Sequence, residues 1–199
     1  MRRCLLIAAL ACATPVITTG QARVQDPLVY RAAVAALFEG KTPETIAVGP
    51  TVVRLHLPES VVLRGGQVNE RLHQYDDIPP GLPERMDALS ITPRPATELA
   101  LPPAFRVLDD SSAALLEAGH WRSLRRRVAA PRGVVHLTPV AYDDAATTAL
   151  VGMAWDCGPG CRRLVATWLV PAGTGGWRVK GSHRFPADWA RRGRHGRKH

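Results

Sequence analysis

The chain has 199 residues, four cysteines and a formal net charge of +9. Seven of the positive charges lie in the first three and the last ten residues, so residues 4–189 carry only +2. The length suits one domain with a core that folds unaided, and the charge distribution argues against a nucleic-acid-binding face on that domain.

The first 22 residues have the layout of a secretory signal peptide. Met1-Arg2-Arg3 is positively charged, and the apolar run Cys4–Ala11 is too short to span a bilayer. Gly20-Gln21-Ala22 offers a small-x-small cleavage site. We therefore expect cleavage after Ala22, a periplasmic or secreted mature protein, and no transmembrane segment after cleavage.

Three other readings of this segment remain open: a buried N-terminal helix, a lipoprotein box at Ala9-Leu10-Ala11-Cys12, and twin-arginine export through Arg2-Arg3. The last two match their patterns poorly. Cleavage after Ala22 removes Cys4 and Cys12 and leaves only Cys157 and Cys161. An even pair in an exported chain predicts a structural disulfide.

The N-terminal half of the remaining chain predicts short elements. Asp26-Pro27 is typical of a helix start, and Gly40 of its end. Thr45–Leu57 predicts two short strands. Between Pro58 and Pro103, frequent prolines leave room only for short pieces, with helical turns at Val68–Tyr75 and Leu82–Leu89.

A longer helix is predicted from Asp109 to Val128. Asp109 is a good N-cap, and apolar residues from Ala114 to Val128 recur at three- and four-residue intervals. Arginines gather near the C-terminal end of this helix, where positive charge interacts favourably with the helix dipole. They are Arg122, Arg125, Arg126 and Arg127. The alternative interpretation is a binding site for a polyanion.

Four strands follow, at Val134–Tyr142, Thr148–Asp156, Arg162–Val170 and Trp177–Ser182. Their short connections require antiparallel neighbours. If Cys157 faces Cys161, Met153 faces Val165 and Leu150 faces Trp168. The fold class is therefore α+β, with a small antiparallel meander of about four strands in the C-terminal half, short helices packed on it, and one disulfide-clipped hairpin.

This half resembles an uncharacterised family of secreted bacterial proteins. The matching residues are Trp121, Pro131, Gly133, Val140, Tyr142, Ala149-Leu150-Val151, Cys157-Gly158, Cys161 and Gly176-Trp177-Arg178-Val179. Two departures are Thr138-Pro139, where the family has a serine, and Arg162, where a glycine often stands. The resemblance implies a small antiparallel sheet with a clipped hairpin, and no known catalysis, substrate or cofactor.

No motif in the sequence indicates catalysis, a metal or a cofactor. The histidines are scattered, and neither a Gly-x-Ser-x-Gly elbow nor a phosphate-binding loop occurs. The three residues between Cys157 and Cys161 also differ from the two of a redox motif. We therefore predict a signal peptide at 1–22, a single α+β domain at 23–186, and a basic, disordered tail at 187–199.

Two functions fit these observations. The first is an exported, non-catalytic protein that binds a protein partner or an anionic surface of the envelope, such as anionic lipid or lipopolysaccharide. The tail would make that contact through Arg191, Arg192, Arg194, Arg197 and Lys198. The alternative is a hydrolase whose site assembles from dispersed residues such as His136, Asp143, Asp144 and His183.

Overall fold

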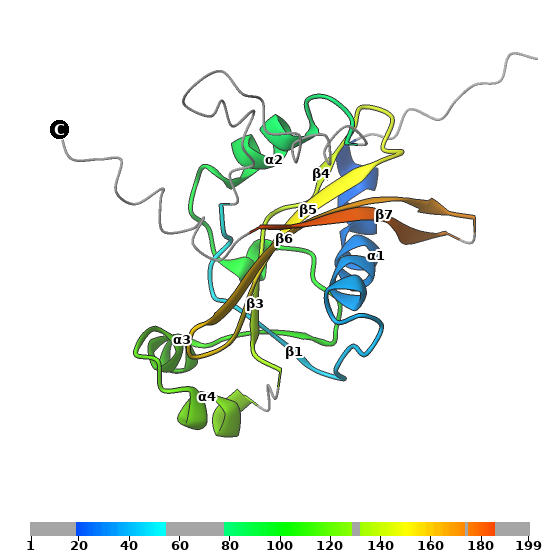
Figure 1. Ribbon diagram of the computed structural model, residues 1–199. Helices are drawn as coiled ribbons and strands as arrows, with labels where there is room; N and C mark the ends of the chain where they lie inside the picture. The colour runs from blue at the N-terminus through cyan, green and yellow to red at the C-terminus, as the bar shows by residue number, and fades with distance from the viewer. Residues whose placement is uncertain (1–18, 55–77, 129–131, 174, 186–199) are drawn as a thin grey trace, which may run out of the picture.

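A computed structural model describes residues 19–54, 78–128, 132–173 and 175–185; for residues 19–24 it describes the backbone alone. Residues 1–18 of the predicted signal peptide 1–22, the helical turns at Val68–Tyr75 and the basic tail at 187–199 lie outside these residues, whereas residues 19–22 are helical. The described chain is α+β, with four α-helices and a mixed seven-stranded sheet (Figure 1).

The sheet is larger than the predicted four-stranded antiparallel meander, and it is mixed. Its order is β2-β1-β3-β5-β6-β7. The short strand β4 also pairs with β5, along the same edge of β5 as β3. The strands are β1 (Ile46–Val48), β2 (Phe105–Val107), β3 (Val134–Leu137), β4 (Ala141–Tyr142), β5 (Ala149–Gly158), β6 (Cys161–Ala172) and β7 (Gly176–Phe185).

The meander prediction is wrong at one end of the sheet. There β1 pairs in parallel with both β2 and β3. Each of these strands is only three or four residues long, too short to show a period of two. The long connections between them allow the parallel crossover that short turns forbid.

The predicted strand Val134–Tyr142 divides into β3 and β4. Between them, the Thr138 Oγ1 atom accepts a hydrogen bond from Gly152 N at 2.9 Å. Pro139 follows and has no amide to donate, so the regular ladder stops there. The break sends Pro139 and Val140 toward the cavity described below.

The central hairpin has the predicted register. Met153 pairs with Val165, and Leu150 pairs with Trp168. The one departure is a bulge between Asp156 and Gly158, after which Gly158 rather than Cys157 pairs with Cys161. Alternate residues of these strands enter two different cores, so both faces of the sheet are covered.

Helix α1 (Thr19–Leu37) covers one face and contacts β5, β6 and β7. It begins before the predicted N-cap Asp26, and Pro27 lies inside it. Val29, Ala33 and Val34 are fully buried against Val48, Val151 and Met153 of the sheet. In Figure 1 this helix (blue) crosses the direction of β7 rather than running parallel to it.

The opposite face is covered in two parts. Helix α2 (Leu82–Ser90) buries Leu82 and Met86 against Leu150 and Trp168. Helices α3 (Asp110–Glu117) and α4 (Trp121–Val128) bury Leu124 nearer β1 and β3.

The predicted single helix over Asp109–Val128 is wrong, because the chain turns at Gly119. Gly119 has φ 71°, a left-handed conformation that favours glycine and separates α3 from α4. The predicted cap is confirmed: the Asp109 side chain accepts a hydrogen bond from Ser112 N at 2.7 Å. Arg127 also contacts the Asp109 carboxylate, at 3.3 Å, so this arginine holds the two helices together.

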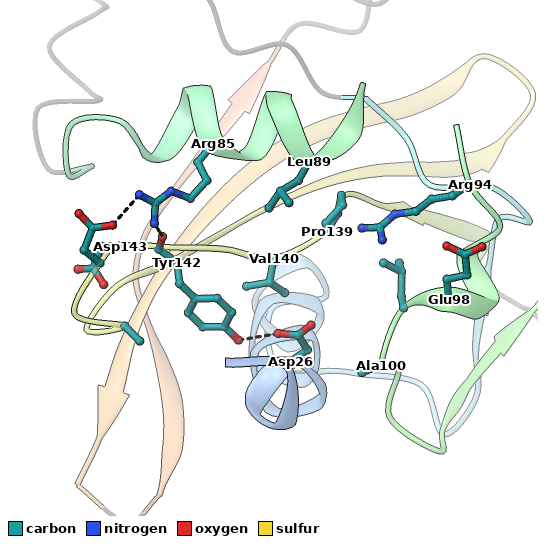
Figure 2. A pocket seen from close by; sticks show the side chains of 13 residues that line it. Asp26, Arg85, Leu89, Arg94, Glu98, Ala100, Pro139, Val140, Tyr142 and Asp143 are labelled. Carbon is teal, nitrogen blue, oxygen red and sulfur yellow. Dashed lines mark hydrogen bonds and ion pairs between the residues drawn. The ribbon is translucent and has the colours of Figure 1, made fainter. Parts of the chain in front are cut away.

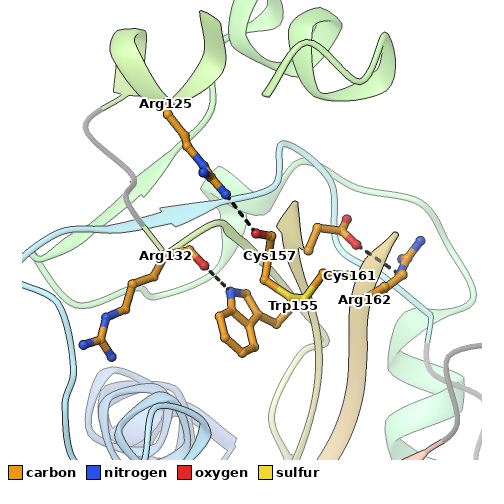
Figure 3. The surroundings of a disulfide bond; sticks show 7 residues. Arg125, Arg132, Trp155, Cys157, Cys161 and Arg162 are labelled. Atoms are coloured by element: carbon orange, nitrogen blue, oxygen red, sulfur yellow. Dashed lines mark hydrogen bonds and ion pairs between the residues drawn. A yellow bond between two sulfur atoms is a disulfide. The ribbon is translucent and has the colours of Figure 1, made fainter. Parts of the chain in front are cut away.

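The predicted disulfide is present, between Cys157 and Cys161, whose Cα atoms lie 5.2 Å apart (Figure 3). Arg125 of α4 donates to the Cys157 carbonyl at 3.0 Å, and Trp155 Nε1 donates to the Arg132 carbonyl at 2.7 Å. Both contacts are independent of the sulfur atoms. The disulfide therefore clips a turn that other contacts already hold.

Replacing both cysteines by serine should lower the free energy of unfolding by about 2 kcal/mol, because the closed loop is short. Urea unfolding of the double variant measures this loss. A reducing agent should lower the free energy of unfolding of the wild type but not of the variant. Loss of the folded state in the double variant would show that the disulfide holds more than its own hairpin.

Candidate functional site

A cavity of about 640 Å³ lies between α2, β4, the start of α1 and the segment 94–100 (Figure 2). Its volume is in the usual range for small-ligand sites. Its lining combines apolar and charged side chains: Asp26, Arg85, Leu89, Arg94, Glu98, Leu99, Ala100, Pro139, Val140, Tyr142, Asp143, Asp144 and Ala146.

Arg94 is held in place through its backbone. It lies between Pro93 and Pro95, and proline restricts the residue before it to extended conformations. The Arg94 carbonyl accepts a hydrogen bond from Val52 N at 2.9 Å, and Thr51 forms a β-bridge with Pro95. The backbone that carries this guanidinium is thereby fixed before any ligand binds.

No described residue forms a hydrogen bond or ion pair with the Arg94 side chain. Its Nε is buried, and no described residue accepts a hydrogen bond from it. Three other side-chain atoms share this condition (Arg162 Nε, Thr167 Oγ1 and Trp168 Nε1), but none of their residues lines the cavity. An unsatisfied buried donor costs about 1–3 kcal/mol, so an acceptor placed here would recover that cost.

Figure 2 shows the Arg94 guanidinium pointing toward Pro139 and Val140, with the Glu98 carboxylate to the right of it in this view. Among the described residues no ion pair joins Arg94 to Glu98, and neither residue has another charged partner there. The cavity therefore presents one cation and one anion that the described fold leaves unpaired.

The second arginine of the cavity, by contrast, is used by the fold. Arg85 Nη1 donates to the Tyr142 carbonyl at 2.6 Å, and Arg85 Nη2 pairs with Asp144 Oδ1 at 2.7 Å. These contacts fasten α2 to the β4–β5 turn. Arg85 thus fixes one wall, and among the described lining residues the cation without a partner is Arg94.

Two tyrosines form a buried polar layer beside the cavity. Tyr142 donates its hydroxyl proton to Asp26 Oδ1 at 2.8 Å, and Tyr30 donates to the Thr138 carbonyl at 3.0 Å. Burial, and next the charge of Asp26, raise the pKa of both phenols well above the ordinary value. Arg94 acts in the opposite direction on the pKa of Tyr30, which places its positive charge near this layer.

These shifts predict a loss of stability at alkaline pH. A raised pKa in the folded state means that folding favours the protonated phenol, so the stabilisation is complete below the unfolded pKa of about 10 and declines above it. Urea midpoints measured between pH 8 and pH 11 should fall, and the tyrosinate absorbance of Tyr30 and Tyr142, taken as the difference from the variant without them, should rise only on unfolding. The double variant Tyr30→Phe/Tyr142→Phe should lack this part of the decline. Ordinary ionisation of both tyrosines in the folded protein would contradict the prediction.

The four residues of the hydrolase hypothesis do not meet at this cavity. Asp143 and Asp144 line it, but Asp143 accepts hydrogen bonds from Thr147 and Thr148 and so closes the β4–β5 turn. His136 pairs with Ala154, five residues along β5 from the partner of Tyr142, or roughly 16 Å away at the rise of a strand.

The two histidines have other surroundings. His136 Nε2 lies 3.0 Å from Asp156 Oδ2, and Arg162 reaches the same carboxylate at 3.4 Å. His183 is on β7 at the sheet edge, where it contacts the Phe185 ring and burial lowers the pKa of its imidazole. Neither histidine lines the cavity.

No cluster of three or more potential metal ligands occurs among the described residues. Within the same part of the chain, none of the helices has the length and apolar character needed to cross a membrane.

Arg94, Glu98 and the apolar lining were not singled out from the sequence. The one local signal is the pattern Pro93-Arg94-Pro95, a charged residue between two residues that stiffen the chain. Comparison of the chain with models of protein families, with curated proteins and with solved structures found no match. The case for a site therefore rests on the geometry of this chain.

Proposed function

We propose that this protein is an exported, non-catalytic binding protein whose cavity takes a small organic anion with an apolar body. The observation that carries the proposal is the buried, unpartnered Nε of Arg94 at the wall of the cavity. A guanidinium binds a carboxylate or phosphate through paired, charge-assisted hydrogen bonds. Leu89, Leu99 and Val140 offer apolar contact for the rest of the ligand.

Export is supported by the signal-like N-terminus and the disulfide together, because disulfides persist in oxidising compartments. The hydrolase alternative is disfavoured because it needs Asp143 and His136 in one cleft, whereas Asp143 caps a turn at the cavity and His136 pairs with Asp156 away from it.

Two probes test the binding site. 3-Phenylpropanoate carries a carboxylate and an aromatic body, and 3-phenylpropanamide has the same shape without the charge. In a titration followed by ¹H–¹⁵N NMR, the acid should bind about tenfold or more tightly than the amide, since a hydrogen bond to a charged group is worth about 1.5–3 kcal/mol. Equal binding of the two, or no binding of the acid, would overturn the proposal.

The basic tail supports a second contact, with an anionic surface. Its five cations follow one another without apolar periodicity: Arg191, Arg192, Arg194, Arg197 and Lys198. We expect the full chain to bind vesicles containing phosphatidylglycerol at low salt and to release them as salt screens the charges. A variant of equal length with glutamine at these positions should lose this binding. Undiminished binding of the variant would remove the tail from the account.

A further inference from the structure

We infer that the ligand of this cavity is an α-amino acid with a large apolar side chain, an inference that rests on the anion-binding function proposed above. Its carboxylate would lie on Arg94 and its ammonium on Glu98. The two charges of the cavity that no described residue pairs have opposite signs and lie on one short segment: Arg94 precedes the 3₁₀ turn Ala96–Glu98, and Glu98 is the last residue of that turn. An α-amino acid carries the complementary pair of charges, a carboxylate and an ammonium group bonded to the same carbon.

The charge of the cavity supports the same ligand. Among the described residues, two arginines and four carboxylates line it, so a ligand that carries a positive group beside its carboxylate meets less repulsion than one with a carboxylate alone. A zwitterion adds no net charge. Asp26 and Asp143 already accept hydrogen bonds from the fold, and Asp144 is paired with Arg85, which leaves Glu98 as the carboxylate for the ammonium.

The apolar side chain then has a defined place. In Figure 2 the Arg94 guanidinium faces Pro139 and Val140, with Leu89 of α2 on the other side of the cavity. A carboxylate on Arg94 would therefore direct the ligand's side chain between α2 and the Pro139–Val140 segment. The volume of about 640 Å³ admits an aromatic side chain.

Isothermal titration calorimetry with L-phenylalanine, 3-phenylpropanoate and phenylalaninamide separates the contributions. L-Phenylalanine should bind more tightly than 3-phenylpropanoate, which lacks the ammonium. The gain should be only about fivefold, because Glu98 is exposed and solvent screens its ion pair. Phenylalaninamide, which lacks the carboxylate, should bind at least about tenfold more weakly than L-phenylalanine.

The variant Glu98→Gln tests whether Glu98 is the residue that contacts the ligand's ammonium. It should reduce the affinity for L-phenylalanine about fivefold and leave the affinity for 3-phenylpropanoate unchanged. The exposed Glu117 on α3 provides the control Glu117→Gln, which should change neither affinity.

The outcomes are distinguishable. If 3-phenylpropanoate binds as tightly as L-phenylalanine, or if Glu98→Gln weakens both ligands equally, the amino-acid inference is wrong and the anion site remains. If neither ligand binds, the proposed function itself fails.

Discussion

Replacing Arg94 by methionine should lower the affinity for 3-phenylpropanoate about ten- to hundredfold, without lowering the free energy of unfolding. The affinity falls because the carboxylate loses charge-assisted hydrogen bonds worth about 1.5–3 kcal/mol. Stability is retained because none of the described residues accepts a hydrogen bond from the buried Arg94 Nε, and methionine removes that unsatisfied donor. Calorimetric titration and urea unfolding of the same samples measure the two effects.

Two further variants show whether the loss of affinity is specific to Arg94 and to its guanidinium. Arg122→Met on α4 removes an exposed arginine that does not line the cavity, so it should leave the affinity unchanged. Arg94→Lys keeps the charge but not the planar pair of donors, and should fall between the wild type and Arg94→Met. Unchanged affinity in Arg94→Met, with 3-phenylpropanoate bound, would show that Arg94 does not contact the anion.

Replacing Gly133 by alanine should destabilise the protein by about 3 kcal/mol or more. Gly133 has φ 107°, and a Cβ there would overlap the Asp156 carbonyl oxygen and lie 2.8 Å from the Cys157 Cα. These are backbone atoms of β5, which cannot turn away as a side chain can. The expected result is a large fall in the urea midpoint or loss of the folded circular dichroism spectrum.

Gly173→Ala is the matched control, because a Cβ at Gly173 has no neighbour within 4 Å. Its effect should stay within about 0.5 kcal/mol, as for most surface substitutions. A loss of less than about 1 kcal/mol in Gly133→Ala would mean that β3 and β5 approach one another less closely than the structure shows.

The sequence predicts the β5–β6 hairpin well because two independent features agree there. The two cysteines set the turn, and the flanking runs supply β-branched residues that pair across it. The pairing of Leu150 with Trp168 follows from the turn alone, since register in a hairpin is determined by its connection.

The parallel edge of the sheet could not be predicted in the same way. β1 and β2 are three residues each, and Ile46 pairs with Phe105 across a long stretch of chain. No turn sets this register, and prolines interrupt the sequence around both strands. The pairing is decided by burial of Ile46 and Phe105 in the core between α1 and the sheet, which is a tertiary effect.

The cavity was unpredictable for a related reason. Its wall joins α1, α2, the segment 94–100 and the β4–β5 turn, and no two of these share a sequence motif. Asp143 and Asp144 are two of the dispersed residues of the hydrolase hypothesis, and they do lie at the cavity. Arg94 was passed over, because the significance of an arginine without partners is visible only once its surroundings are known.

The most direct test of the central claim is a crystal structure of the protein with 3-phenylpropanoate. The account predicts the carboxylate at about 2.7–2.9 Å from the Arg94 guanidinium, the distance of a charge-assisted hydrogen bond, and the ring between Leu89 and Val140. A ligand bound elsewhere, or a ring in the cavity with its carboxylate turned away from Arg94, would contradict it.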